Sequence, residues 1–319
     1  TVGEWLDIWQ SEYLGNVKPF TVLTYSQNVK NHIRPAMGAI KLDALNTPII
    51  QKFYNDLGKP KGDKPGLSAK TIKGVHGVLH KALSQAVAIG YLRFNPADAC
   101  KLPRVERKEI KPLDNDEIAA FVKAVQGNRF EALYLVTLFT GMRRGEVCGL
   151  TWDCVDLDRG TIYVHKQLQN IPGHPGEYRL VSAKSGRART IAAAPFVMEV
   201  LKRHKAQQAA ERLKAGPLWQ DKKFVFCNEA GEHVSPHTVY ENFKRIATSI
   251  GRPDARLHDL RHSYAVAAIQ AGDDPKTVQV NMGHSSATFT MDVYGHSTDR
   301  MKKASADRMQ AFIQSIWAP

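Results

Sequence analysis

The chain has 319 residues, 43% of them hydrophobic and 24% charged, a composition typical of a globular protein long enough for two domains. No apolar run approaches the roughly 18 residues that a membrane span needs, which excludes a transmembrane protein. Four scattered cysteines without a C-x-x-C pair are expected to be reduced thiols of a cytosolic protein, and 44 Lys and Arg against 31 Asp and Glu favour a polyanionic partner such as nucleic acid.

Residues 1–112 predict an all-helical domain. Apolar residues recur at helical spacing in four segments, 2–13, 21–33, 48–57 and 68–90. The second helix is predicted to stop near Pro35. The third is predicted to begin at an N-cap Thr47 followed by Pro48, and the fourth to run from Ser68 to Gly90.

The segment 95–114 contains three prolines and a run of charges without apolar periodicity, which is typical of an extended linker. We therefore expect a first domain over residues 1–107, a linker over 108–112 and a second domain over 113–319. Residues 1–112 carry 17 basic and 9 acidic side chains, so more than half of the net charge of +13 lies in this smaller part.

The second domain is predicted to be α+β, mainly helical with a small antiparallel sheet. Asp114 and Glu117 form a capping-box pattern, and a strongly apolar helix over about 129–140 should end at Gly141. Segments 161–169 and 189–194 are expected to pair as a hairpin joined by a long loop, with another short strand at 223–227. Ser235 should start a helix that runs to about Ile250.

Polar side chains suited to phosphate chemistry concentrate at four places in this domain, each of which also has an ordinary structural explanation when taken alone. They are TGMRRGE with Arg143 and Glu146, SAKSGRART with Lys184, RLHDLRHSYAVAAIQ with His258 and Arg261, and NMGHSSATFTMDVYGH with His284 and Tyr294.

The third stretch permits two interpretations. His258 and His262 are spaced i, i+4 with Asp259 between them, so they could be zinc ligands with His284 as a third. Alternatively, His258 and Arg261, at i and i+3, could point together at a phosphate.

Taken together, two arginines, two histidines, a lysine and a tyrosine suit phosphoryl transfer to a tyrosine nucleophile. The arginines would neutralise the non-bridging oxygens, on which charge spreads further in the transition state. The lysine could protonate the leaving oxygen and a histidine could accept the tyrosine proton. The cations of such a site are side chains, so neither a metal nor a cofactor is expected.

In this order and spacing, T-G-x-R-x-x-E, a hairpin lysine, H-x-L-R-H, G-H-S-S and a tyrosine ten residues after that histidine resemble the tyrosine recombinases, the integrases of phages and conjugative transposons. The resemblance spans essentially the whole chain, with a four-helix, SAM-like core-binding domain followed by a catalytic domain. The chain departs from the family at Asn281 and Met282, which stand before Gly283 and His284 where leucine is usual.

The resemblance implies a role for each residue. Tyr294 would be the nucleophile, Arg143 and Arg261 the phosphate clamps, and Lys184 the general acid toward the 5′-hydroxyl. His258 and His284 would bond the phosphate or move protons, and Glu146 would orient Arg143. Lys70, Lys73 and Arg104 are DNA-contact candidates by position.

The implied function is DNA integration and excision for a mobile element, by a 3′-phosphotyrosyl intermediate that needs neither ATP nor Mg²⁺. The implied partners are double-stranded DNA at specific recombination sites, three further copies of the chain in a synaptic tetramer, and accessory DNA-bending or excision proteins, with no membrane. The implied location is the bacterial cytoplasm, at the nucleoid. Because the chain starts at Thr1, an arm-site-binding domain is expected to have preceded it.

Three alternatives remain: a topoisomerase with the same chemistry, a DNA-binding regulator without catalysis, and a zinc hydrolase. The C-terminal stretch after residue 297 carries an apolar stripe at helical spacing, which could cover the chain's own core or dock on a neighbouring protomer. The stripe consists of Met301, Ala304, Met309, Phe312, Ile313 and Ile316.

Overall fold

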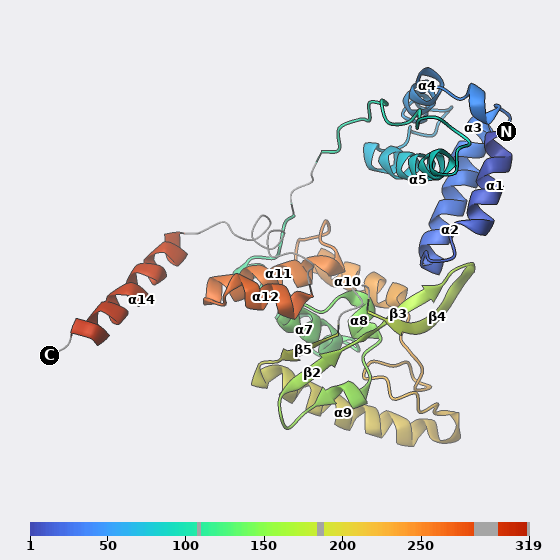
Figure 1. Cartoon of the computed structure of the whole chain (residues 1–319). Coiled ribbons are helices and arrows are strands. Elements are labelled where there is room, and N and C mark those ends of the chain that lie inside the picture. Colours follow the sequence, from blue (N-terminus) through green and yellow to red (C-terminus); the bar gives the residue numbers. More distant parts are fainter. Residues whose placement is uncertain (107–109, 184–187, 284–298, 318–319) are drawn as a thin grey trace. The chain divides into compact units, whose positions relative to one another are not determined.

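The computed structural model describes residues 1–106, 110–183, 188–283 and 299–317 (Figure 1). The chain divides into two compact units, the first formed by Thr1–Lys108 and Ile171–Pro175 and the second by Glu109–Asn170 and Gly176–Pro319. Each unit has a hydrophobic core of its own. No helix in the described ranges is both long enough and apolar enough to cross a membrane.

The first unit is built from helices around two buried tryptophans, Trp5 and Trp9. The indole N–H of Trp5 donates to the carbonyl of Ala82 at 3.0 Å, which ties the first helix to the last. Its elements are α1 (Val2–Glu12), α2 (Pro19–Asn28), the π-helical turn η1 (Val29–Ile33), α3 (Arg34–Met37), the 3₁₀ turn η2 (Leu42–Ala44), α4 (Thr47–Leu57) and α5 (Ala69–Ala88).

The predicted stop of the second helix near Pro35 is wrong, because the chain stays helical through η1 and α3 to Met37. A proline inside a regular α-helix lacks an N–H and clashes with the carbonyl four residues before it. Just before Pro35 the helix widens into the π turn, where the N–H of Arg34 bonds the carbonyl of Val29. This wider turn accommodates the proline ring without breaking the helix.

The N-cap of α4 is Asn46 rather than the predicted Thr47. The side chain of Asn46 accepts a hydrogen bond from the N–H of Ile49 at 3.1 Å. The hydroxyl of Thr47 instead donates to the carbonyl of Pro96 at 2.7 Å, which holds the start of the linker segment against α4. The predicted N-cap of α5, Ser68, is confirmed.

The second unit begins at α6, whose predicted capping box of Asp114 and Glu117 is confirmed. Its predicted helix start at Ser235 is also confirmed. The helical elements are α6 (Asn115–Ala124), α7 (Glu131–Thr140), α8 (Arg144–Cys148), η3 (Trp152–Cys154), α9 (Pro195–Ala215), η4 (Gly216–Leu218), α10 (Pro236–Ser249), α11 (Leu257–Ala271), α12 (Pro275–Met282) and α14 (Asp299–Trp317).

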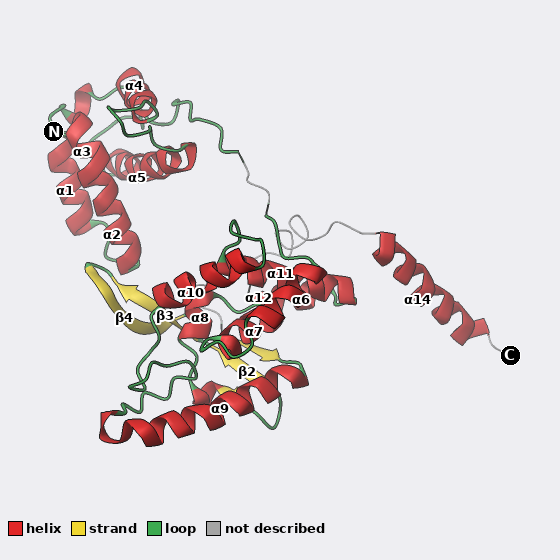
Figure 2. Ribbon diagram, turned by 180° about the vertical axis from the view of Figure 1, so that it is seen from behind, coloured by secondary structure: helices red, strands yellow, loops and turns green. Residues whose placement is uncertain are grey.

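The strands of this unit form a three-stranded antiparallel sheet in the order β1-β2-β5 and a separate two-stranded sheet, β3-β4. In the first sheet Ile162 faces Ile191, and Val164 faces Arg189. The strands are β1 (Val155–Asp156), β2 (Thr161–Val164), β3 (Lys166–Ile171), β4 (His174–Ser182) and β5 (Arg189–Ala192). In both views β2 lies between α9 and the group that contains α7 and α12 (Figure 2).

Two strand predictions need correction. The pairing of 161–164 with 189–192 is confirmed, but most of the expected long loop between them is the β3–β4 hairpin. Its second strand, HPGEYRLVS, lacks the apolar alternation that would have revealed it. The segment 223–227 forms isolated bridges, Thr151 with Phe224 and Cys227 with His233, rather than a strand.

The core of the second unit centres on a contact of three rings, Phe121, Tyr134 and Phe243, from α6, α7 and α10. Almost every residue of α7 is buried, because α11 packs on one side of it and α9 on another. As predicted, α7 ends at Gly141, which has a left-handed φ of 65°. A Cβ atom on Gly141 would lie 2.4 Å from Cδ1 of Tyr264 in α11.

Gly141→Ala should therefore destabilise the protein more than a matched substitution at another left-handed glycine. Gly127 has a φ of 70°, but a Cβ atom added there would meet no other atom within 4 Å, so Gly127→Ala should cost only the backbone term of about 1–2 kcal/mol. Gly141→Ala should add about 1–3 kcal/mol from the overlap with Tyr264. Urea unfolding of both variants measures the difference, and equal losses would contradict the close contact.

Candidate active site

Arg143 lies at the start of α8, as its N-cap residue. Its backbone N–H donates to Oε2 of Glu146 at 2.9 Å, and its Nη1 donates to Oε1 of the same carboxylate at 2.8 Å. The side chain of Arg143 keeps 22% of its surface exposed, whereas that of Glu146 is fully buried. The predicted pairing of these two residues is thus present, with the arginine facing outward over a buried carboxylate.

Arg189, at the start of β5, is the second partner of Glu146. Its Nη1 and Nη2 donate to Oε1 and Oε2 of that carboxylate at 3.1 and 2.7 Å. Arg189 was not among the predicted site residues. The alternation of a β-strand could have revealed that Arg189 is buried, because side chains two residues apart lie on the same face and Arg189 shares the buried face of β5 with Ile191.

Glu146 is consequently ionised at any physiological pH. Burial raises the pKa of a carboxyl group, but the hydrogen bonds and charges of Arg189 and Arg143 outweigh it and hold the pKa of Glu146 at about 2. A buried carboxylate is stable only when its charge and its lone pairs are both satisfied. Here two guanidinium groups do both.

Arg261 enters the site from α11 and is 1% exposed. Its Nη1 donates to the carbonyl of Gly141 at 2.6 Å, and its Nη2 donates to the carbonyl of Met282 at 2.5 Å. The guanidinium therefore bridges the end of α7 and the end of α12, so the ends of both helices determine where its N–H groups point.

The last turn of α12 collects all three arginines. Three consecutive carbonyls, those of Asn281, Met282 and Gly283, accept hydrogen bonds from Arg189, Arg261 and Arg143 respectively. The distances from the donor nitrogens are 2.7, 2.5 and 2.7 Å. Carbonyls at a helix C-terminus carry partial negative charge, so they attract cations. The structure thus brings the predicted Arg143 and Arg261 to one place.

His258 lies one turn before Arg261 on α11, and its ring meets that of His262 edge to face with centroids 4.8 Å apart. Protein atoms packed around the ring and the guanidinium of Arg261 lower the pKa of His258 to about 4, although the residue has exposed surface. Burial and the neighbouring His258 likewise lower the pKa of His262 to about 4. Both imidazoles are therefore neutral at pH 7, and His258 can accept a proton or a hydrogen bond.

Three predicted site residues, Lys184, His284 and Tyr294, lie outside the described residues. The predicted DNA contacts lie in the first unit and are exposed: Lys70 and Lys73 on α5, and Arg104 in the linker segment. Within the described ranges, no group of three or more His, Cys, Asp or Glu side chains is arranged to hold a metal ion. The third zinc ligand of the alternative interpretation, His284, belongs to the undescribed part.

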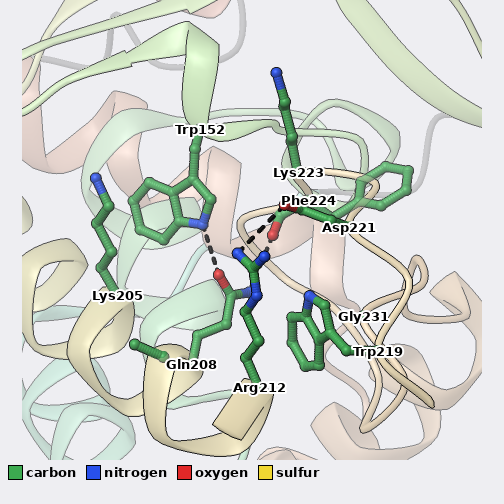
Figure 3. A pocket seen from close by; sticks show the side chains of 10 residues that line it. Trp152, Lys205, Gln208, Arg212, Trp219, Asp221, Lys223, Phe224 and Gly231 are labelled. Atoms are coloured by element: carbon green, nitrogen blue, oxygen red, sulfur yellow. Dashed lines mark hydrogen bonds and ion pairs between the residues drawn. The ribbon is translucent and has the colours of Figure 1, made fainter. Parts of the chain in front are cut away.

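A cavity of about 170 Å³ beside α9 shares no residue with the arginine group (Figure 3). Its wall is occupied by internal bonds: the indole of Trp152 donates to Gln208 at 2.6 Å, and Arg212 pairs with Asp221 at 3.3 Å. These side chains satisfy one another. The arginines that donate to the end of α12 are Arg143, Arg189 and Arg261, and none of them lines this cavity.

Two models of protein families match the chain. The phage integrase family matches residues 111–301, and its N-terminal SAM-like domain matches residues 1–58. The first match covers more than half of the chain, which therefore belongs to the phage integrase family and is a tyrosine recombinase with the corresponding fold.

Individual relatives are similar over nearly the full chain. A tyrosine recombinase XerC-like protein of Caldanaerobacter subterraneus is 28% identical over 95% of this chain and 81% of its own length. The ICEBs1 integrase of Bacillus subtilis is 27% identical over 95% of this chain and 82% of its own. The solved Tn1549 transposon integrase in complex with transposon right end DNA is 25% identical, with a TM-score of 0.80 over 97% of this chain and 99% of that one.

Glu146→Gln should lower the free energy of unfolding by about 3–5 kcal/mol at pH 7, because it leaves two largely desolvated guanidinium groups without a counter-charge. Glu232→Gln is the matched control: Glu232 pairs with Lys222 at 2.8 Å but is 35% exposed, so its loss should cost at most about 1 kcal/mol.

Glu146→Gln also tests the lowered pKa of the Glu146 carboxyl group. A carboxyl whose pKa falls on folding stabilises the protein above its unfolded pKa, and that stabilisation is lost as the pH falls through the folded value. For Glu146 this window runs from about pH 4.5 down to about pH 2. As the pH is lowered through this window, the free energy of unfolding should decrease more steeply for the wild type than for Glu146→Gln. Equal decreases in the two proteins would contradict the lowered pKa of Glu146.

Proposed function

We propose that this protein is the site-specific recombinase of a mobile element, and that it integrates and excises DNA through a 3′-phosphotyrosyl intermediate. The observation that carries the proposal is the convergence of Arg143 and Arg261 on the last turn of α12, directly before His284 in the chain. Two guanidinium groups aimed at adjacent acceptors suit the non-bridging oxygens of one phosphate.

The arginines would act chiefly in the transition state. As the phosphorus becomes five-coordinate, negative charge spreads over its non-bridging oxygens. Donors that are already oriented stabilise that charge without reorganising. Arg261 is oriented by Gly141 and Met282 and Arg143 by Glu146, so both are held before the substrate arrives.

The remaining steps fall to the residues carried over from the family motif. The hydroxyl oxygen of Tyr294 would attack phosphorus and the bond to the 5′-oxygen would break, leaving a 3′-phosphotyrosyl link. Lys184 would supply the proton to the departing 5′-oxygen, and neutral His258 would accept the tyrosine proton, with His284 bonding the phosphate. Attack by a 5′-hydroxyl of the partner site reverses the step, so strand joining consumes neither ATP nor metal.

DNA is the proposed partner of both domains. The surplus of basic residues in the first domain and the exposed Lys70, Lys73 and Arg104 support backbone contacts there. Residues 1–107 would bind the core site, 108–112 would link the domains, and 113–319 would cut and rejoin strands. The setting we propose is a bacterial nucleoid, with accessory DNA-bending or excision proteins. A topoisomerase would share the cleavage step but relax DNA without exchanging partners.

Tyr294→Phe should abolish a covalent protein–DNA adduct that the wild type forms in EDTA. The substrate is a nicked duplex carrying the element's recombination site, and the adduct is measured on a denaturing gel. The variant lacks the nucleophilic oxygen, whereas Tyr240→Phe on α10 is a tyrosine control that should keep the adduct.

Wild-type activity that collapses in EDTA would instead favour a metal enzyme. Specific binding without any adduct would favour a regulator. Relaxation of supercoils without exchange between two sites would favour a topoisomerase.

We also propose that α14 docks on a neighbouring protomer in a synaptic tetramer. Four apolar side chains on one side of this helix are exposed: Met309 (58%), Phe312 (59%), Ile313 (40%) and Ile316 (64%). An apolar stripe of this kind is stable in water only when another surface covers it.

Removing residues 299–319, or replacing Phe312 and Ile316 by serine, should weaken assembly on paired sites while leaving binding to a single site intact. Gln310→Ala with Gln314→Ala changes the other side of the same helix and should have no effect. Analytical ultracentrifugation of the DNA complexes distinguishes the cases, and assembly that persists after truncation would contradict the docking role.

A further inference from the structure

Arg189 contacts both Glu146 on α8 and the end of α12, although it does not belong to the motif that defines the candidate site. Its side chain is 5% exposed. Through Nη1 and Nη2 it holds both oxygens of Glu146, and through Nε it holds the carbonyl of Asn281 at 2.7 Å. One planar guanidinium thus joins strand β5, helix α8 and the end of helix α12.

The carboxylate of Glu146 is shared equally between two arginines. Oε1 accepts from Nη1 of Arg143 and Nη1 of Arg189, and Oε2 accepts from the backbone N–H of Arg143 and Nη2 of Arg189. If Arg189 is removed, each oxygen loses one of its two donors, and the carboxylate keeps only the backbone N–H and Nη1 of Arg143. The direction in which Arg143 points therefore depends on Arg189.

The end of α12 depends on the same residue. A Cβ atom on Gly283 would lie 3.0 Å from Nη1 of Arg189, so the guanidinium packs directly against this left-handed turn. The carbonyls of Met282 and Gly283 in that turn are the acceptors of Arg261 and Arg143. Arg189 thus sets the position of the backbone that both phosphate-binding arginines touch.

We propose that Arg189 is a positioning residue of the strand-transfer reaction: it acts through Glu146 and the last turn of α12 to aim Arg143 and Arg261 at one phosphate. The inference rests on the proposed function. We assign Arg189 no contact with the phosphate, since the motif does not include it and its three nitrogens hold Glu146 and the carbonyl of Asn281. Lysine cannot replace it fully, since a single ammonium cannot reach two carboxylate oxygens and a carbonyl in one fixed plane.

Arg252 offers a matched control within the same unit. It bonds two carboxylates, those of Glu117 and Asp254, where Arg189 bonds one, and like Arg189 it bonds one carbonyl, that of Lys111. None of these partners belongs to the candidate site. Arg252→Met therefore removes an arginine with the same kinds of partner, and reports what the loss of such a residue does through stability alone.

The experiment measures the single-turnover rate of covalent adduct formation on the nicked site at saturating protein, together with DNA affinity by gel shift. Arg189→Met should slow adduct formation by about 10- to 100-fold, the size of effect that follows removal of residues that orient the ligands of a metal. DNA affinity should stay close to that of the wild type. Arg189→Lys should be intermediate, and Arg252→Met should leave the rate unchanged.

Two readouts separate positioning from a structural role. In an Arg143→Ala background, Arg189→Met should cost a clearly smaller factor than it does alone, since the residue through which it acts is gone. As the pH is lowered, adduct formation by Arg189→Met should also begin to slow at a higher pH than adduct formation by the wild type. Glu146 then keeps only Arg143 as a charged partner, and protonating it releases that arginine.

The proposal would be overturned if Arg189→Met slowed adduct formation by the same factor in the Arg143→Ala background as it does alone. An equal loss of rate in Arg252→Met would overturn it as well. A wild-type rate in Arg189→Met would do so too. If Arg189→Met does not fold, Arg189→Lys carries the same comparisons. Failure of the proposed function is distinguishable, because the wild type would then form no adduct, or Tyr294→Phe would still form one.

Discussion

The candidate site depends on one buried negative charge. Glu146 has no solvent contact and is ionised, which requires cations on both sides of it. Arg143 and Arg189 meet that requirement, and in doing so they draw α8 and β5 together. Because both arginines also donate to the end of α12, the carboxylate indirectly fixes the position of that turn, at Asn281 and Gly283.

Helix ends supply most of the other geometry. Arg261 spans the carbonyls at the ends of α7 and α12, and both helices end at glycines with left-handed φ, Gly141 and Gly283. A glycine in this conformation turns the backbone away from the helix axis and leaves carbonyls free to accept other donors. Tyr264 then covers Gly141 and accepts from Asn281 at 3.1 Å, so one side chain packs across both helix ends.

Much of the fold was predictable because it follows from local rules. The capping residues Asp114, Ser68 and Ser235 each begin the expected helix, since a side-chain oxygen can satisfy the free N–H groups there. The errors arose where a wider context decides. Pro35 fits inside a helix because a π turn precedes it, and β4 is a strand because β3 lies beside it rather than because of its own apolar pattern.

By itself, the sequence determined the class of fold, the order of the motifs and the identity of Arg143, Glu146, His258 and Arg261 as candidates, since spacing and side-chain chemistry are local properties. Only the tertiary structure showed that Arg143 and Arg261 converge on adjacent carbonyls and that Arg189 completes the group. The physical reason is that β5, α8, α11 and α12 are brought together by packing and by a shared buried charge. Partners that meet in this way leave no mark in the spacing of residues along the chain.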